Sequence, residues 1–230
     1  MGEMIQVTLA GRKTVFSCRD RAPVFLWAGW DPSEEEINDL YSKTGRDDFS
    51  VFSFGTTDWD GDYSPWPAAL GENRAFSGQA QNTLSWLKEQ AGPYLEKQET
   101  GPMYMMGYSL AGLFALFTMY EWEQPAGAVC CSSSLWYPGW MDYARTYSPF
   151  PGKRIYLSLG GREASSGEMI MRSIEQNTRE QEKLLKGDRN VKKACLRMVP
   201  GGHFADSVKR LAMGVNWLMN DSASFGKEIY

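Results

Sequence analysis

The sequence lacks the features that mark several large classes of protein. Its 230 residues carry a formal net charge of −4 with Lys and Arg scattered, which argues against nucleic acid or an anionic membrane surface as a partner. No apolar run approaches the roughly 20 residues that a membrane-spanning helix needs. The first residues, MGEMIQVTLAGRK, lack the pattern of a signal peptide, and Gln6 stands where myristoylation requires Ser or Thr. We therefore expect a cytoplasmic protein that does not associate with membranes.

Cysteine and histidine are also scarce. The four cysteines include the neighbours Cys130 and Cys131 inside an apolar run, a poor place for a disulfide, and their spacings match no zinc pattern. We expect buried free thiols in a reducing compartment and no metal site. The chain has one histidine, His203, so any chemistry that requires an imidazole must use it.

What is present is an alternation of short apolar runs with helical patterns, without repeats or low-complexity segments. This alternation predicts a single α/β domain over residues 1–230, with a mainly parallel sheet and helices on both faces. A chain this short leaves room for little or no cap domain. We predict strands within residues 4–11, 22–29, 49–55, 101–107, 126–133, 154–161 and 191–202, and helices within 31–45, 79–98 (kinked at Pro93), 110–122, 169–187 and 204–220.

One serine lies at a junction that a core helix would not need. The segment GPMYMMGYSLAGLFAL reads as a strand, a sharp turn at Ser109 and a helix, which is the setting of a nucleophile elbow. In such an elbow the residues two before and two after the serine must be small, as Gly107 and Ala111 are. The alternative is that Ser109 only caps the helix, which leaves the small residues unexplained. The pattern favours a nucleophilic Ser109.

A serine nucleophile needs a base, and His203 lies in the predicted position for one. It follows the last predicted strand, in the loop VPGGHF before the closing helix. The third member should be a carboxylate that orients the imidazole, and Glu163 comes first after the penultimate strand. Glu168 is the next candidate, Asp188 and Asp206 are weaker ones, and a serine–histidine pair without a fixed acid remains an alternative.

Two backbone amides are expected to stabilise the negative charge that develops on the substrate oxygen. The amide of Leu110 follows the nucleophile, at the start of a helix. The second donor should come from the loop after residues 22–29, where Trp30 is the first choice and Gly29 the second.

Aromatic side chains gather in Pro- and Gly-rich loops. Tyr63, Trp66, Trp136, Tyr137 and Trp140 could form the wall of an acyl pocket, or they could pack the loops against the domain. The alternating Asp58, Asp60 and Asp62 lack the glycine and glutamate of a calcium loop, and we interpret them as a solvated turn.

Four segments together resemble a known family. GYSLAGLFAL, SSSLWYPGW, YLSLGGRE and GGHF are similar to the esterase D and enterochelin-esterase branch of the α/β-hydrolases, most of all to a group of small, largely uncharacterised bacterial hydrolases. DWDGDYSPWPA resembles a further motif of that group, and the resemblance spans about residues 20 to 218. It implies an α/β-hydrolase fold and cofactor-free hydrolysis of an ester or thioester, with Ser109, Glu163 and His203 as the catalytic residues.

The function predicted from the sequence is a serine esterase that acts on a small-molecule acyl ester. Two alternatives stay open: an acyltransferase with the same chemistry, and a non-catalytic ligand-binding protein of this fold. The sequence gives neither the substrate nor the oligomeric state.

Overall fold

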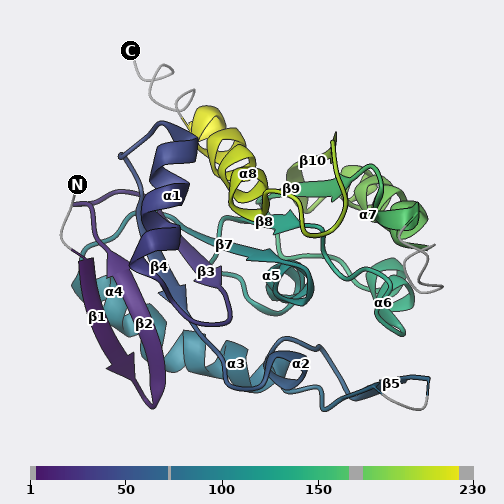
Figure 1. The fold of residues 1–230 in the computed structure, drawn as a ribbon, viewed down its shortest axis with the longest axis horizontal. Helices are drawn as coiled ribbons and strands as arrows, with labels where there is room; N and C mark the ends of the chain where they lie inside the picture. The colour runs from purple at the N-terminus through teal and green to yellow at the C-terminus, as the bar shows by residue number, and fades with distance from the viewer. Residues whose placement is uncertain (1–3, 72–73, 166–172, 223–230) are drawn as a thin grey trace.

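A mainly parallel sheet of eight strands forms the centre of the molecule (Figure 1). The computed structural model describes residues 4–71, 74–165 and 173–222. The strand order is β1-β2-β4-β3-β7-β8-β9-β10, and only the β1–β2 and β2–β4 pairs are antiparallel. The strands are β1 Met4–Leu9, β2 Arg12–Ser17, β3 Val24–Ala28, β4 Ser50–Phe54, β7 Met103–Tyr108, β8 Gly127–Cys131, β9 Lys153–Gly160 and β10 Val191–Val199, with a separate hairpin of β5 Ala68–Leu70 and β6 Arg74–Phe76.

Helices cover both faces of the sheet. Helices α1 and α8 pack together on one face, and the helices between β6 and β10 lie on the other side (Figure 1). The helices are α1 Glu34–Thr44, α2 Trp59–Asp62, α3 Ala80–Trp86, the π-helix η1 Leu87–Ala91, α4 Gly92–Lys97, α5 Leu110–Glu121, α6 Trp140–Thr146, the 3₁₀ helix η2 Glu163–Ser165, α7 Ile174–Gly187 and α8 Ser207–Ser222. The described ranges contain no separate cap domain.

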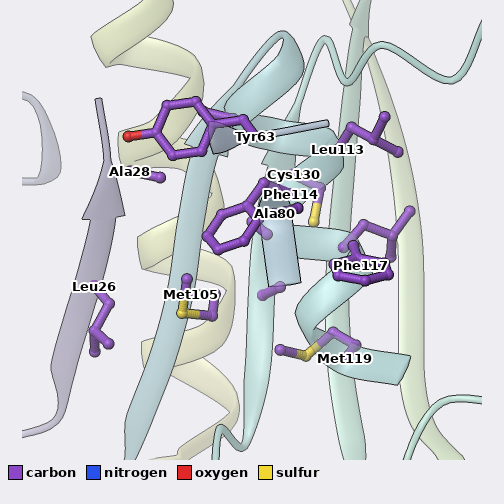
Figure 2. Packing of buried hydrophobic residues seen from close by; sticks show 14 of the residues in the cluster. Leu26, Ala28, Tyr63, Ala80, Met105, Leu113, Phe114, Phe117, Met119 and Cys130 are labelled. Carbon is purple, nitrogen blue, oxygen red and sulfur yellow. The ribbon is translucent and has the colours of Figure 1, made fainter. Parts of the chain in front are cut away.

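Burial on both faces explains why the central strands are continuously apolar. In β3, Leu26 belongs to the core on the α5 side, whereas Phe25 and Trp27 belong to the core under α1 and α8. Helix α5 is apolar all round because it is buried on all sides, and its residues Leu113 and Phe114 lie among the core side chains of Figure 2. The strand and helix that flank Ser109 are therefore fixed by packing over their whole length.

The chain switches direction within the sheet between β3 and β7. From β3 it runs through α1 to β4 on one side, and it then returns to β7 on the other side of β3. In open α/β sheets such a switch leaves a crevice at the carboxyl ends of the two strands. Gly29–Trp30 and Ser109 follow β3 and β7, so both lie at the carboxyl ends of these two neighbouring strands.

The predicted mainly parallel α/β architecture is confirmed, but three strands were missed: β2 of the main sheet and the short hairpin strands β5 and β6. Strand β2 pairs with β1 through a two-residue turn at Ala10 and Gly11, whose φ values of 46° and 82° fit the tight hairpin turns that suit twisted strands. The charged start of β2, Arg12 and Lys13, obscured its apolar half.

The helical segment that contains Pro93 is continuous from the start of α3 to the end of α4. A π-helix, Leu87–Ala91, directly precedes Pro93, and this wider turn accommodates a residue that has no amide hydrogen to donate. The first four residues of the helix predicted over 169–187 lie outside the described residues, and α7 begins at Ile174.

The cysteines are free, but they are not all buried. Cys130 and Cys131 are enclosed in β8 as expected, whereas Cys18 and Cys195 are half-buried, so the expectation of four buried thiols was wrong for two of them. Among the described residues, no helix is both long and apolar enough to cross a membrane.

Candidate active site

Ser109 occupies a strained position between β7 and α5. Its φ of 60° and ψ of −122° lie outside the regions that side-chain-bearing residues normally adopt. Such a conformation costs on the order of 1–3 kcal/mol and persists only where the surroundings enforce it. The Ser109 side chain makes no capping hydrogen bond to α5, so the alternative in which it serves only as a helix cap is wrong.

Close packing between β7 and α5 confirms why the neighbours of Ser109 are small. A Cβ atom on Gly107 would lie 2.2 Å from the carbonyl oxygen of Ala111, a separation that real structures do not show. A Cβ atom on Gly112 would lie 2.7 Å from the Ser133 hydroxyl. The three small residues let the helix start directly above the end of the strand, and this geometry holds Ser109 in the turn.

His203 approaches Ser109 from the loop between β10 and α8. Its Nε2 atom lies 3.0 Å from Ser109 Oγ, and its Nδ1 atom lies 2.8 Å from Glu163 Oε2. The side chain of His203 is 18% exposed, so the imidazole borders solvent. The structure therefore brings together the serine, the histidine and the first-choice carboxylate, with Nε2 placed to receive a proton from Ser109 and Nδ1 placed to donate a hydrogen bond to Glu163.

Glu163 begins the short helix η2 just after β9 and is completely buried. Its Oε1 atom accepts hydrogen bonds from the Gly160 amide at 2.7 Å, the Ser132 hydroxyl at 2.7 Å and Arg210 Nη1 at 2.9 Å. Burial raises the pKa of Glu163, but the hydrogen bonds from His203, Ser132 and Gly160 outweigh it and hold the pKa below its ordinary value. The carboxylate is thus kept ionised beside the imidazole.

The other acid candidates have different surroundings. Asp188 follows α7, and its side chain accepts from the Asn190 amide at 2.8 Å in a turn. Asp206 precedes α8, one residue before the closing helix on which we expected it, with a φ of 50°. Glu168 lies outside the described residues.

Three polar residues around Glu163 were not predicted. They are Tyr108, Ser132 and Arg210, for which the sequence alone predicted no role at the site. Arg210 Nη1 lies 2.8 Å from the Tyr108 hydroxyl and 2.7 Å from Ser132 Oγ, and the Tyr108 hydroxyl donates to the His203 carbonyl. In the sequence, Tyr108 adjoins Ser109 and Arg210 lies in the predicted closing helix. Tyrosines and arginines occur beside many site segments, so this proximity alone could not identify them as part of the site.

The loop after β3 brings the amides of Gly29 and Trp30 to the carboxyl end of that strand. The Gly29 amide donates to the Phe54 carbonyl at 3.1 Å, so it is engaged within the sheet. Within the described part of the chain, no acceptor was found for the amides of Trp30 or Leu110. The Trp30 and Leu110 positions therefore remain the candidates for the two oxyanion donors.

Of the five aromatic residues predicted for a pocket, three are enclosed. Tyr63 is 0% exposed and donates its hydroxyl to the Gly29 carbonyl at 2.6 Å, and Tyr137 and Trp140 are buried as well. These three residues match the alternative that the aromatics pack the loops, and Tyr63 supports the loop that carries Trp30. Trp66 and Trp136 are half-buried, and Trp66 donates to the Pro138 carbonyl at 2.9 Å.

The DWDGDY segment forms a single helical turn whose aspartates all have partners, and of the three only Asp58 is exposed, as a solvated turn predicts. Asp58 caps α2 through the Gly61 amide, Asp60 pairs with Arg74 at 2.7 Å, and Asp62 pairs with Arg12 at 3.1 Å. Among the residues that the structure describes, no group of three or more His, Cys, Asp or Glu side chains could hold a metal ion.

Comparison of the sequence with known proteins gives a distant relative but no family. No family model matches the chain. Over 175 residues, or 71% of the chain, it is 27% identical to YbbA, an uncharacterised protein of Bacillus subtilis (strain 168), of which 70% is covered.

Solved structures superpose over nearly the whole chain. An IroE-like serine hydrolase from Shewanella oneidensis matches with a TM-score of 0.82 and 16% identity over 95% of this chain and 81% of that one. The siderophore hydrolase EstA from Aspergillus nidulans matches with a TM-score of 0.75 and 18% identity, over 96% of this chain and 95% of that one. The α/β-hydrolase fold is thereby confirmed, as is the resemblance in fold to the enterochelin-esterase branch.

Proposed function

We propose that this chain is a serine hydrolase that cleaves a carboxylic ester or thioester of a small molecule through an acyl-enzyme on Ser109. The observation that carries the proposal is the continuous contact from Ser109 Oγ to His203 Nε2 at 3.0 Å and from His203 Nδ1 to Glu163 Oε2 at 2.8 Å. Such distances suit proton transfer, and a serine needs this help to act as a nucleophile. The names of the structural neighbours, a serine hydrolase and a siderophore hydrolase, add support.

In the first half of the reaction, Ser109 Oγ attacks the acyl carbon and passes its proton to His203 Nε2. The substrate carbonyl oxygen gains the negative charge, and the amides of Leu110 and Trp30 donate hydrogen bonds to it. Glu163 Oε2 accepts the hydrogen on Nδ1 and stabilises the imidazolium. His203 then gives the proton to the departing alcohol or thiol as its bond to the acyl carbon breaks.

In the second half, water replaces the leaving group. His203 removes a proton from the water as its oxygen attacks the acyl carbon, and it returns this proton to Ser109 Oγ when the acid leaves. If an alcohol or amine took the place of water, the same residues would carry out acyl transfer. We favour hydrolysis because His203 borders solvent.

Covalent labelling with a fluorophosphonate tests the proposal without knowledge of the substrate. We expect intact mass spectrometry to find one adduct on the wild type, none on Ser109→Ala, and labelling slowed by at least about 10³-fold on His203→Ala. Ser148→Ala, which removes an exposed serine, is the matched control and should label like the wild type. A folded wild type that stays unlabelled would instead support a non-catalytic binding protein.

If the fluorophosphonate labels the wild type, the next experiment is a substrate screen. Acyl esters of increasing chain length and siderophore esters, the latter suggested by the name of the EstA neighbour, would be compared by product formation. Added alcohol or amine acceptors would distinguish the two reactions, because transfer yields a new ester or amide whereas hydrolysis yields the free acid.

A further inference from the structure

Arg210 is a buried cation on α8 that the serine–histidine–carboxylate contacts do not by themselves require. Its side chain is 3% exposed and that of its ion-pair partner Glu163 is 0% exposed. Removing two charges from water is costly, and a buried pair offsets this cost only with good geometry and further hydrogen bonds. An apolar residue on α8 would avoid that cost, so the guanidinium calls for an explanation beyond packing.

The guanidinium contacts both the acid and the loop that carries the histidine. Nη1 contacts Glu163 Oε1 at 2.9 Å, and Nη2 donates to the Gly202 carbonyl at 2.8 Å and approaches the Pro200 carbonyl at 3.4 Å. Nη1 also contacts the Tyr108 hydroxyl, which in turn donates to the His203 carbonyl. One side chain thus fixes the distance between η2 and the β10–α8 loop.

The two carboxylate oxygens of Glu163 have different hydrogen-bond partners. Arg210, the Ser132 hydroxyl and the Gly160 amide all donate to Oε1. Oε2 is left to His203 Nδ1. A carboxylate held by three donors on one oxygen cannot rotate without breaking them, so the oxygen that faces the imidazole stays in place.

We propose that Arg210 is a positioning residue of the site: it orients Glu163 toward His203, and its fixed positive charge limits how strongly the carboxylate favours the imidazolium. The inference rests on the proposed function only for its catalytic consequence, because the charge balance at His203 can be measured without catalysis.

The other titratable groups that face Glu163 and Arg210 are neutral near pH 7. Burial raises the pKa of Tyr108 on β7, that of Cys131 on β8 to about 12, and that of Tyr156 on β9. The charges that act directly on the imidazole from these elements are therefore Glu163 and Arg210. Without Arg210, no positive charge offsets the negative charge of Glu163, and the protonated imidazole of His203 becomes easier to form.

The single histidine makes this charge balance directly observable. In untagged protein, the imidazole NMR signals belong to His203 alone. We expect Arg210→Met to move the midpoint of the His203 titration upward by about one pH unit, the scale expected when one charged neighbour is lost. Arg210→Lys should return the midpoint close to the wild-type value because it keeps the charge. Lys209→Met, which removes an exposed charge one residue away, is the matched control.

Labelling rates then test the positioning role. With the fluorophosphonate, Arg210→Met should shift the acid limb of the rate profile to higher pH, so that on this limb its labelling rate is about tenfold below that of the wild type. Arg210→Lys should keep the limb but lower the plateau, because an ammonium cannot reach both Glu163 and the loop carbonyls. If Arg210→Met fails to fold, Arg210→Gln takes its place in both measurements, and the comparison with Arg210→Lys is unchanged.

Two results would overturn the inference. One is an unmoved His203 midpoint in a folded charge-removed variant. The other is a plateau for Arg210→Lys equal to that of the wild type. Absence of labelling on the wild type would reject the proposed function but would leave the NMR result to decide the charge balance.

Discussion

The two halves of the candidate site are built in opposite ways. The half with the nucleophile is a continuous stretch from β7 through Ser109 into α5, held by close steric contact of backbone with backbone. The half with the acid and the histidine joins β8, η2, the β10–α8 loop and α8 by hydrogen bonds and charge. The half with the nucleophile contains a strained backbone conformation, and the half with the acid and the histidine contains buried charges. Substitutions in the two halves should therefore have different signatures.

The largest effect is expected at Ser109, where one substitution should lower activity and raise stability. Ser109→Gly removes the nucleophile, so ester hydrolysis should fall by about 10⁴-fold or more. Glycine tolerates the φ of 60° and ψ of −122°, so the free energy of unfolding should rise by about 1 kcal/mol. Ester turnover and urea unfolding measure the two effects.

A serine in an ordinary helix provides the control for that result. Ser85→Gly lies within α3, where glycine should lower the free energy of unfolding by about 0.5–1 kcal/mol. If Ser109→Gly destabilised the protein as Ser85→Gly does, the elbow would not hold the strain that we assign to it.

The next largest effect is expected at Glu163, where activity and stability should fall together. Glu163→Gln should slow hydrolysis by about 10²–10⁴-fold because the amide no longer stabilises the imidazolium. The folded-state pKa of Glu163 lies below its ordinary value of 4.5, so its charge adds stability above that pH, and this contribution is lost as the pH falls through the folded-state pKa.

Urea unfolding of both proteins at several pH values measures this linkage. We expect the stability difference between wild type and Glu163→Gln to shrink as the pH drops below about 4.5. The control is Glu175→Gln, at an exposed ion pair with Arg179, which should change little across the range. A difference that stayed constant with pH would contradict the ionised, buried Glu163.

The smallest effect is expected at the serines that follow β8. Ser132→Ala removes one of the donors to Glu163 Oε1, so we expect about a tenfold loss of hydrolysis and about 1 kcal/mol of stability. Ser134→Ala is the matched control, because no hydrogen-bond partner of its buried hydroxyl was found among the described residues. Equal effects of the two substitutions would show that Ser132 does not act through the acid.

The difference between the two halves also explains which of them the sequence could predict. Gly107, Ser109 and Ala111 are close in sequence, and the steric demand that links them is local. Glu163 and His203 were predicted because each follows a recognisable strand, so the topology brings them to one edge of the sheet.

The network around the acid could not be predicted in this way. Arg210 meets Tyr108 across 102 residues and Ser132 across 78 residues. No spacing rule connects residues so far apart, and the helical pattern of α8 does not reveal which polar side chain turns inward. The packing of Tyr63 under the Gly29–Trp30 loop was uncertain for the same reason, because a loop aromatic can face a cavity or the core.

The separation of Ser109 and His203 along the chain also has a consequence during synthesis. They lie 94 residues apart, and ribosomes add about 5–20 residues per second, so the serine leaves the ribosome roughly 5–20 s before the histidine. Arg210 and α8 follow later still. During that interval the nascent chain holds a nucleophile without its base, so the activity that we propose cannot begin before His203 has been synthesised. A newly made molecule is thus inert toward cellular esters until the β10–α8 loop and α8 have docked.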